Sequence, residues 1–542
     1  MIKMKNIYAF LLVLLMVAVT VQAQKTFKNP VLPGFHPDPS LCRVGDDYYM
    51  VTSSFEWFPG LPVYHSKDLV NWEQIGHVLN RPSQLQMKEG MKASNGLWAP
   101  TIRYHNGMYY VICTATGCGG NFFVTANNPQ GPYSEPVFIK DAPGIDPSLF
   151  FDDDGKAWYC GSINGSDKIP PRRYPAEDRI YIQQLNLENG KFIGERHIVT
   201  SGYAINSPYA EAPHIYKING KYYLNIAEGG TWEDHAVSVF TADVVTGPYT
   251  PFVCNPVLTH RHLGNDIDIT TVGHSDWVQT QHGDWYAMML GVRPVGGYNM
   301  LGRETFLTSM KFQGEQPIFN PGIGRVLMED KFPNLLESPV PAPAARDDFE
   351  SESLAYCWNF LRTPFEQWYQ LKDNGLWIKL RSNKLTELTN PSLIARRVQH
   401  HQFQATTQMK LTSLAPGEEA GIIIMQNDRF QYRLVLTGKE KKQPQQLRLV
   451  CVKSGSETIV ASIPYKEKEI MLCIRGEGLN YTFLYGISES ELRPLGECQD
   501  ATICSTNIAR GFIGPFIGMY GSSNGKESKN EVGFDWFEYD GQ

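Results

Sequence analysis

The sequence has no runs of basic residues, and its charge is close to balanced. Its 49 Lys and Arg stand against 56 Asp and Glu, a formal net charge of −7. Proteins that bind nucleic acid or anionic membranes concentrate positive charge on one surface or segment. The composition therefore argues against both kinds of partner.

The spacings typical of zinc sites are also missing. No Cys-x-x-Cys or His-Glu-x-x-His pattern occurs, so the sequence gives no support for such a site. The ten cysteines are scattered, and most lie inside apolar, strand-like runs, where buried free thiols are expected. Cys498 and Cys504 lie close enough in sequence to suggest a disulfide.

No apolar run reaches the roughly 20 residues that a membrane span needs. A shorter run over residues 7–21 follows Lys3 and Lys5, and Val21-Gln22-Ala23 then offers small residues where a signal peptidase cuts. We therefore predict a signal peptide over residues 1–23, a mature chain beginning near Gln24, and a periplasmic or secreted protein. No membrane span is expected after cleavage.

Long amphipathic helices are absent, and one phrase instead recurs five times between residues 30 and 290. Each copy starts with a polar or aromatic residue and ends about 11 positions later in an aromatic pair, after a tight turn such as Asn-Gly or Asp-Gly. Such turns between apolar runs are hairpin signals. The first residues of the five copies are Asp38, Trp98, Asp146, Glu211 and His274.

Each period also contains two further apolar runs, which makes four strands per repeat, the pattern of a propeller blade. We therefore predict a five-bladed β-propeller over residues 26–336. Innermost strands line the channel of a propeller, so the five first residues should meet at its axis. Burying three unpaired carboxylates there would cost free energy, which indicates that they are kept for a function. The alternative is that each Asp-Pro or Glu-Ala-Pro only caps a turn.

The remaining segments complete an all-β fold. Arg303, in Leu301–Thr305, is predicted in an inward loop where it would bind sugar hydroxyls or steady a carboxylate. Residues 337–348, rich in Pro and Ala, predict a linker. Residues 349–542 hold about ten strand-like runs without helical periodicity, which predicts an antiparallel β-sandwich. The aromatic content of 12 % fits either packed β cores or platforms for sugar rings.

Seven ordered motifs then carry a family resemblance. They are Phe35–Ser40, Ser53–Gly60, Leu97–Pro100, Ile145–Ser148, Glu211–Lys217, Ala227–Thr231 and Leu301–Thr305. Together they resemble the family 43 glycoside hydrolases, in the branch of β-xylosidases and α-L-arabinofuranosidases. Leu393–Val398 and Gly533–Phe537 are similar to the concanavalin-like sandwich that follows the propeller in these enzymes. The resemblance implies an exo-acting, inverting hydrolase of xylan or arabinoxylan oligosaccharides.

Carried over by motif, the resemblance implies that Asp38 is the general base and Glu211 the general acid. Asp146 would position Glu211 and raise its pKa by like-charge proximity. Inversion needs such a pair on opposite sides of the anomeric carbon.

The resemblance also implies residues around the sugar. The predicted walls are Phe55, Trp57 and Trp98, and the predicted polar partners are Thr231, His274 and Arg303. It requires no cofactor, but it allows a calcium ion or a water cluster near the axis, which His274 would help to bind.

A Gly-rich stretch over residues 509–519 holds Phe512 and Phe516. Our hypothesis is that one of them closes the sugar subsite and favours action on chain ends; the alternative is ordinary sandwich core.

Two features leave the substrate open between xylose and arabinose. The acid motif reads Glu-Ala-Pro instead of Glu-Gly-Pro, and residues 163–178 form a long loop beside the third repeat. Two other functions remain alternatives: a non-catalytic carbohydrate-binding propeller, which would not require all three acids, and a retaining, fructan-active enzyme with five blades.

Overall fold

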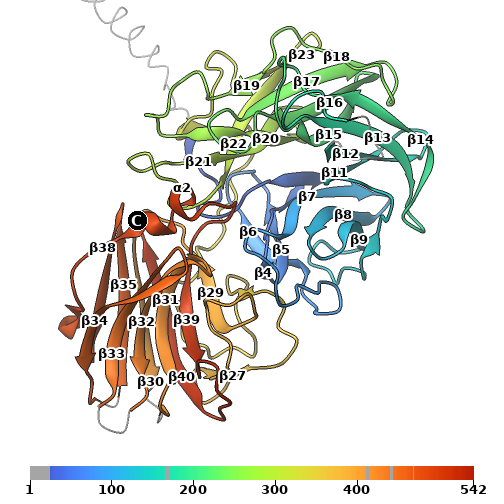
Figure 1. The fold of residues 1–542 in the computed structure, drawn as a ribbon. Coiled ribbons are helices and arrows are strands. Elements are labelled where there is room, and N and C mark those ends of the chain that lie inside the picture. Colours follow the sequence, from blue (N-terminus) through green and yellow to red (C-terminus); the bar gives the residue numbers. More distant parts are fainter. Residues whose placement is uncertain (1–24, 165–170, 411–413, 440–443, 468) are drawn as a thin grey trace, which may run out of the picture.

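The computed structural model describes residues 25–164, 171–410, 414–439, 444–467 and 469–542. In this part of the chain a propeller and a sandwich lie side by side (Figure 1). The predicted signal peptide and part of the 163–178 loop lie outside the described residues. Within them, no helix is both long and apolar enough to cross a membrane.

Five antiparallel sheets, each built on four strands in chain order, form a closed ring, which confirms the predicted five-bladed propeller. Blade one is β2 (Ser40–Val44), β3 (Asp47–Val51), β5 (Gly60–Ser66) and β6 (Glu73–Leu79); blade two is β7 (Gly96–His105), β8 (Met108–Thr116), β9 (Gly120–Ala126) and β10 (Val137–Phe138). Blade three is β11 (Ile145–Phe151), β12 (Ala157–Asn164), β13 (Asp178–Asn186) and β14 (Lys191–Thr200).

Blade four is β15 (Glu211–Ile218), β16 (Lys221–Glu228), β17 (Ala236–Ala242) and β18 (Thr250–Pro251), with β19 (Leu258–Thr259) also on β17. Blade five is β20 (Thr270–Gln279), β21 (Trp285–Val292), β22 (Glu304–Gln313) and β23 (Gln316–Phe319). The predicted hairpin turns are present: Asn106-Gly107 has φ of 50° and 82°, and Asn219-Gly220 has 51° and 82°. Two consecutive positive φ angles match the twist of a tight hairpin, and Asn-Gly adopts them readily.

The two ends of the propeller segment pair with each other. β1 (Thr26–Lys28) pairs antiparallel with β24 (Glu329–Lys331). Beside this pair, the buried Asn29 amide donates to the carbonyls of Leu307 and Leu327 at 2.9 and 2.8 Å. The first described residues are thereby tied to the segment that follows blade five.

Four of the five innermost strands, those of blades two to five, are irregular where the phrase begins. Their pairing skips residues between Trp98 and Thr101, Ile145 and Ser148, Glu211 and His214, and Gly273 and Asp276. Positive φ values occur at Asp38 (56°), Ala99 (43°), Asp146 (54°), Ala212 (50°) and His274 (53°). A bulge redirects a side chain, and strained non-glycine backbone of this kind gathers at functional sites. In these four blades the irregular pairing turns the first residue of the phrase toward the axis, and in blade one Asp38 lies just before β2.

The C-terminal body confirms the predicted sandwich of two antiparallel sheets. One sheet follows the order β27 (Tyr369–Leu371), β28 (Leu376–Lys379), β40 (Glu531–Gly541), β30 (Gln402–Lys410), β35 (Glu469–Glu477), β36 (Asn480–Gly486), β37 (Arg493–Pro494), with β25 (Arg346–Asp347) on β40 and β38 (Gln499–Asp500) on β36. The other follows β29 (Ser392–Arg397), β39 (Phe516–Ser522), β31 (Glu419–Asn427), β32 (Phe430–Thr437), β33 (Gln446–Lys453), β34 (Ser456–Pro464). β25 lies within the last residues of the segment predicted as a linker.

Helical structure in the described residues is limited to η1 (Glu489–Glu491), η2 (Ala501–Cys504) and α2 (Thr506–Ala509). All ten cysteines are free, so the suggested Cys498–Cys504 disulfide is wrong. Cys504 is buried and Cys498 exposed, which keeps the two side chains in different environments.

The two bodies are joined by backbone and side-chain contacts. β4 (Trp57–Phe58), in the connection between β3 and β5 of blade one, pairs with β26 (Phe360–Leu361) from the sandwich segment. The buried guanidinium of Arg362 donates to the Met91 carbonyl at 2.9 and 2.7 Å. These contacts hold the sandwich beside the mouth of the propeller.

Candidate active site

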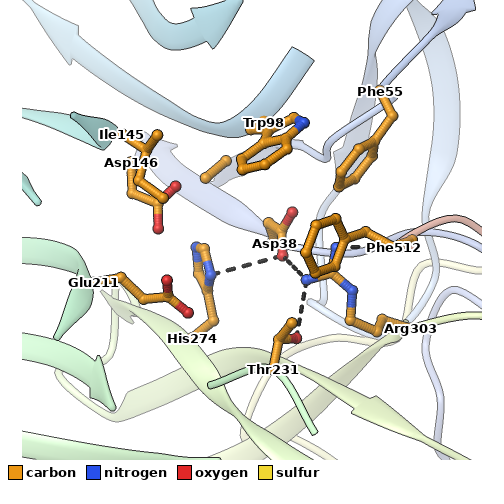
Figure 2. A pocket seen from close by; sticks show the side chains of 11 residues that line it. Asp38, Phe55, Trp98, Ile145, Asp146, Glu211, Thr231, His274, Arg303 and Phe512 are labelled. Atoms are coloured by element: carbon orange, nitrogen blue, oxygen red, sulfur yellow. Dashed lines mark hydrogen bonds and ion pairs between the residues drawn. The ribbon is translucent and has the colours of Figure 1, made fainter. Parts of the chain in front are cut away.

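The first residues of the five phrases meet in one pocket at the propeller axis (Figure 2). The pocket holds about 390 Å³ of space, its open mouth included. Its lining residues are Asp38, Phe55, Trp98, Ala99, Ile145, Asp146, Glu211, Thr231, His274, Arg303 and Phe512. The inference from repeat spacing, that these residues converge although far apart in sequence, is confirmed.

Asp38 is a buried carboxylate fixed on both oxygens. Arg303 Nη1 donates to Oδ1 at 2.7 Å, and Ser53 Oγ donates to Oδ2 at 2.6 Å. His274 Nδ1 lies 3.6 Å from Oδ1. Burial alone would raise the pKa of Asp38, but the Arg303 and His274 charges and the Ser53 hydrogen bond hold that pKa below its ordinary value. Asp38 is therefore ionised at neutral pH.

Glu211 and Asp146 lie together on the other side of the pocket (Figure 2). Asp146 Oδ2 accepts the backbone N–H of Ala212, the neighbour of Glu211, at 3.2 Å. Burial, followed by the charge of Asp146, raises the pKa of Glu211 well above its ordinary value. Burial and the charge of Asp38 also raise the pKa of Asp146. The pocket thus holds one ionised carboxylate opposite a carboxyl that retains its proton.

Asp146→Asn is expected to move the basic limb of the pH profile of kcat/KM to lower pH, by about one pH unit. The reason is the sign of the interaction: the charge of Asp146 raises the pKa of Glu211, so its removal lets Glu211 lose its proton at lower pH. Asp153→Asn, on an exposed side chain in the turn after β11, is the matched control and should leave the profile unchanged. An unmoved basic limb in Asp146→Asn would contradict this coupling.

Three aromatic rings wall the pocket on one side. The ring centroids of Phe55 and Trp98 are 5.9 Å apart, and those of Trp98 and Phe512 are 5.4 Å apart. Phe512 comes from the sandwich segment, which passes close to the propeller at Gly514: a Cβ there would lie 2.3 Å from the Leu301 carbonyl. Glycine thus permits the approach that carries Phe512 into the pocket.

Two candidate residues, the predicted wall residue Trp57 and Phe516, one of the two candidates for closing the subsite, do not line the pocket. Trp57 and Phe516 are fully buried and stack on each other, with ring centroids 3.6 Å apart, outside the pocket lining. The reason is that Trp57 lies in β4, which pairs with the sandwich, and Phe516 begins β39. Both rings belong to the contact between the two bodies, and only Phe55 and Phe512 of their motifs reach the pocket.

Ser94, which belongs to none of the predicted motifs, joins three parts of the site. Its N–H donates to Glu56 Oε2 at 3.0 Å, its hydroxyl accepts the N–H of Phe512 at 2.9 Å, and its carbonyl accepts the Trp98 indole N–H at 2.9 Å. Ser94 therefore fixes the sandwich loop against the aromatic wall. Ser53 has a similar role, since its hydroxyl also accepts the Ala99 N–H at 2.7 Å.

Farther along the innermost strands, an ion pair fills the axis. Arg103 donates to both oxygens of Asp276 at 2.8 and 3.1 Å, and Ser40 and Tyr216 donate to the same carboxylate. The guanidinium supplies the positive charge there, and Asp276 is fully buried. Among the described residues, no group of three or more His, Cys, Asp and Glu side chains could hold a metal ion.

Calcium prefers about six to eight oxygen ligands, and the Arg103 pair offers no such set. The Arg103–Asp276 pair is therefore not a calcium site. A calcium ion near His274 stays a prediction, and no chemical step depends on it.

Comparisons with known proteins agree with this architecture. Residues 27–317 match the family model "Glycosyl hydrolases family 43", and residues 346–540 match "Beta xylosidase C-terminal Concanavalin A-like domain". The chain is 38 % identical to a xylosidase/arabinosidase of Butyrivibrio fibrisolvens, over 94 % of this chain and 98 % of that protein. It is 37 % identical to a non-reducing end α-L-arabinofuranosidase of Bacteroides ovatus, over 99 % of each.

Solved structures show the same similarity. A xylan β-1,4-xylosidase from Bacillus halodurans superposes with a TM-score of 0.88 at 33 % identity, covering 95 % of this chain and 99 % of that one. A Bacteroides ovatus protein from a xyloglucan utilisation locus gives a TM-score of 0.88 at 36 % identity, covering 96 % and 100 %. The similarity therefore extends over both bodies of the chain.

Proposed function

This chain belongs to glycosyl hydrolases family 43, and from that premise we propose that it removes single xylosyl or arabinofuranosyl residues from the ends of xylan or arabinoxylan oligosaccharides. It is a glycosidase. The two pentoses are those in the names of its relatives, a xylosidase/arabinosidase and an α-L-arabinofuranosidase. A neutral sugar also suits the pocket, because aromatic rings and hydrogen-bonding groups line it side by side.

The feature that carries the mechanism is that Asp38 and Glu211 have pKa values shifted in opposite directions, Asp38 downward and Glu211 upward. Inverting glycosidases need an ionised carboxylate to activate water and a protonated carboxyl, across the sugar, to assist departure of the leaving group. Asp38 is kept ionised chiefly by Arg303, whereas burial and Asp146 keep Glu211 protonated. We assign Asp38 as base, Glu211 as acid and Asp146 as a positioning residue.

The proposed reaction is a single displacement. A water molecule held by Asp38 attacks the anomeric carbon and gives its proton to that carboxylate. The bond from the anomeric carbon to the leaving oxygen breaks, and Glu211 donates its proton to that oxygen. After the products leave, Asp38 releases its proton to solvent and Glu211 takes one up, which restores the starting state.

The pocket geometry supports action on chain ends. Phe512 covers one side of the pocket, and its N–H is fixed by Ser94. Arg303 Nη1 donates to Thr231 Oγ1 at 3.1 Å as well as to Asp38, so the polar wall is also fixed. A pocket enclosed in this way admits the terminal sugar and leaves the rest of the chain outside.

We also propose that the protein is exported from the cytoplasm. Lys3 and Lys5 followed by the apolar run over residues 7–21 support a cleaved signal peptide, and a polysaccharide substrate is met outside the cytoplasm. The mass of the mature chain, beginning near Gln24, tests this point.

Proton NMR during the first turnovers tests the mechanism. The first free sugar should have the anomeric configuration opposite to that of the substrate, because one displacement inverts the carbon. Release of the retained anomer would overturn the assignment and favour the retaining alternative. A folded protein that turns over no pentoside, across a panel of aryl pentosides, arabinoxylan, arabinan and xylo-oligosaccharides, would favour a carbohydrate-binding module.

A further inference from the structure

We infer that Trp232 and Tyr209 form a second sugar-binding site beside the pocket, for the uncharged ring that carries the leaving-group oxygen. This inference rests on the proposed function and adds to it the recognition of the leaving group. Neither residue lines the pocket itself.

The first support is an aromatic side chain left open next to the site. Trp232 directly follows the pocket residue Thr231, and 44 % of its surface is exposed. Its ring meets that of Tyr209 edge to face, with centroids 5.7 Å apart and an interplanar angle of 83°. An indole exposed to this extent leaves apolar surface in water that a ligand could cover.

The second support is position. Tyr209 stands two residues before Glu211, the residue that protonates the leaving oxygen in the proposed reaction. The ring that carries this oxygen must therefore lie near Glu211 and outside the pocket, which holds the terminal sugar. Tyr209 precedes Glu211 and Trp232 follows Thr231 in the sequence. The two rings therefore stand where we place the leaving group, outside the pocket and beside these two pocket residues.

The third support is rigidity, which lowers the entropy lost when a ligand binds. The Trp232 N–H donates to the Gly230 carbonyl at 2.9 Å, and the His235 N–H donates to the Trp232 carbonyl at 3.0 Å. Gly230, at φ +79°, lies against both rings, since a Cβ there would be 3.0 Å from each. The Tyr209 N–H donates to the Ala176 carbonyl at 2.9 Å. The backbone that carries the two rings is thus fixed before any sugar arrives, and Gly230 packs against both rings.

The surrounding charge indicates which sugars fit. Glu233 and Asp234 follow Trp232 and are exposed. Carboxylates at this rim repel acidic substituents, whereas the faces of aromatic rings pack well against the C–H groups of a neutral sugar. The site therefore suits a neutral pentose or hexose ring.

The test compares two substrates that differ only in the leaving group. A disaccharide that ends in the cleaved pentose places its second sugar ring against Trp232 and Tyr209. The corresponding glycosyl fluoride has no second ring. For Trp232→Ala we expect kcat/KM on the disaccharide to fall about fivefold to tenfold, with kcat/KM on the fluoride unchanged. Trp232→Phe should keep most of the disaccharide activity. Phe365→Ala, which removes an aromatic ring 57 % exposed on the sandwich segment, is the matched control.

Equal losses on both substrates would overturn the inference, because Trp232 would then only support Thr231. An unchanged disaccharide rate would overturn it as well, because the ring would then be ordinary surface. Failure of the proposed function looks different: the wild-type protein itself would then cleave neither substrate, or would release the retained anomer.

Discussion

An Asp38→Ala enzyme is expected to retain less than about one thousandth of the wild-type kcat while remaining folded. Without this carboxylate no group accepts the proton of the attacking water. Arg303 loses its buried partner, but Thr231 Oγ1 still accepts from it. The measurements are kcat on an aryl pentoside and the thermal midpoint by circular dichroism.

Two companion variants separate the loss of the base from other effects. Asp38 has φ of 56°, a conformation that Asn tolerates better than Ala, so Asp38→Asn removes the base with less backbone strain and should be about as inactive. Asp46→Ala, on an exposed residue in the turn after β2, should behave as wild type. Azide needs no base and should restore turnover in Asp38→Ala. A near-normal kcat in that variant would end the assignment.

A Glu211→Gln enzyme is expected to lose activity according to its leaving group. On a disaccharide, kcat/KM should fall about a hundredfold to ten thousandfold, because the departing sugar oxygen needs a proton. On a 2,4-dinitrophenyl glycoside the loss should be far smaller, because that leaving group departs as a stable anion. Kinetics on the two substrates in parallel measure the difference.

The control for this variant is Glu188→Gln, on an exposed residue between β13 and β14, which should leave both rates unchanged. The basic limb of the pH profile should also disappear in Glu211→Gln, since Gln has no proton to lose. If both substrates lost activity to the same extent, Glu211 would not be the proton donor.

The parts of the site that sequence could predict are those set by the repeat. Asp38, Asp146 and Glu211 occupy equivalent places in three blades, so the architecture alone brings them to one axis. Arg303 and Thr231 follow from motifs that flank the same strands. Where the blade sets the direction in which a side chain points, the sequence repeat alone is enough to predict that the side chain lies at the axis.

The parts that sequence could not predict depend on contacts between the two bodies. Trp57 and Phe55 stand two residues apart in one motif, yet only the pairing of β4 with β26 decides which ring faces the pocket. Ser94 belongs to no motif, and its three hydrogen bonds exist only after the sandwich loop has docked. The Arg103 pair with Asp276 likewise needs strands from two blades, β7 and β20.

The bulges at the start of the innermost strands have an evolutionary consequence. Regular pairing resumes only beyond them, at residues such as Thr101, Ser148 and His214. The strand pairing thus places little demand on the identity of the residue beside the bulge, and an indole, an imidazole and two carboxylates occupy such places in blades two to five. We therefore expect that one substitution at such a position can change the chemistry of the pocket while the blade keeps its fold.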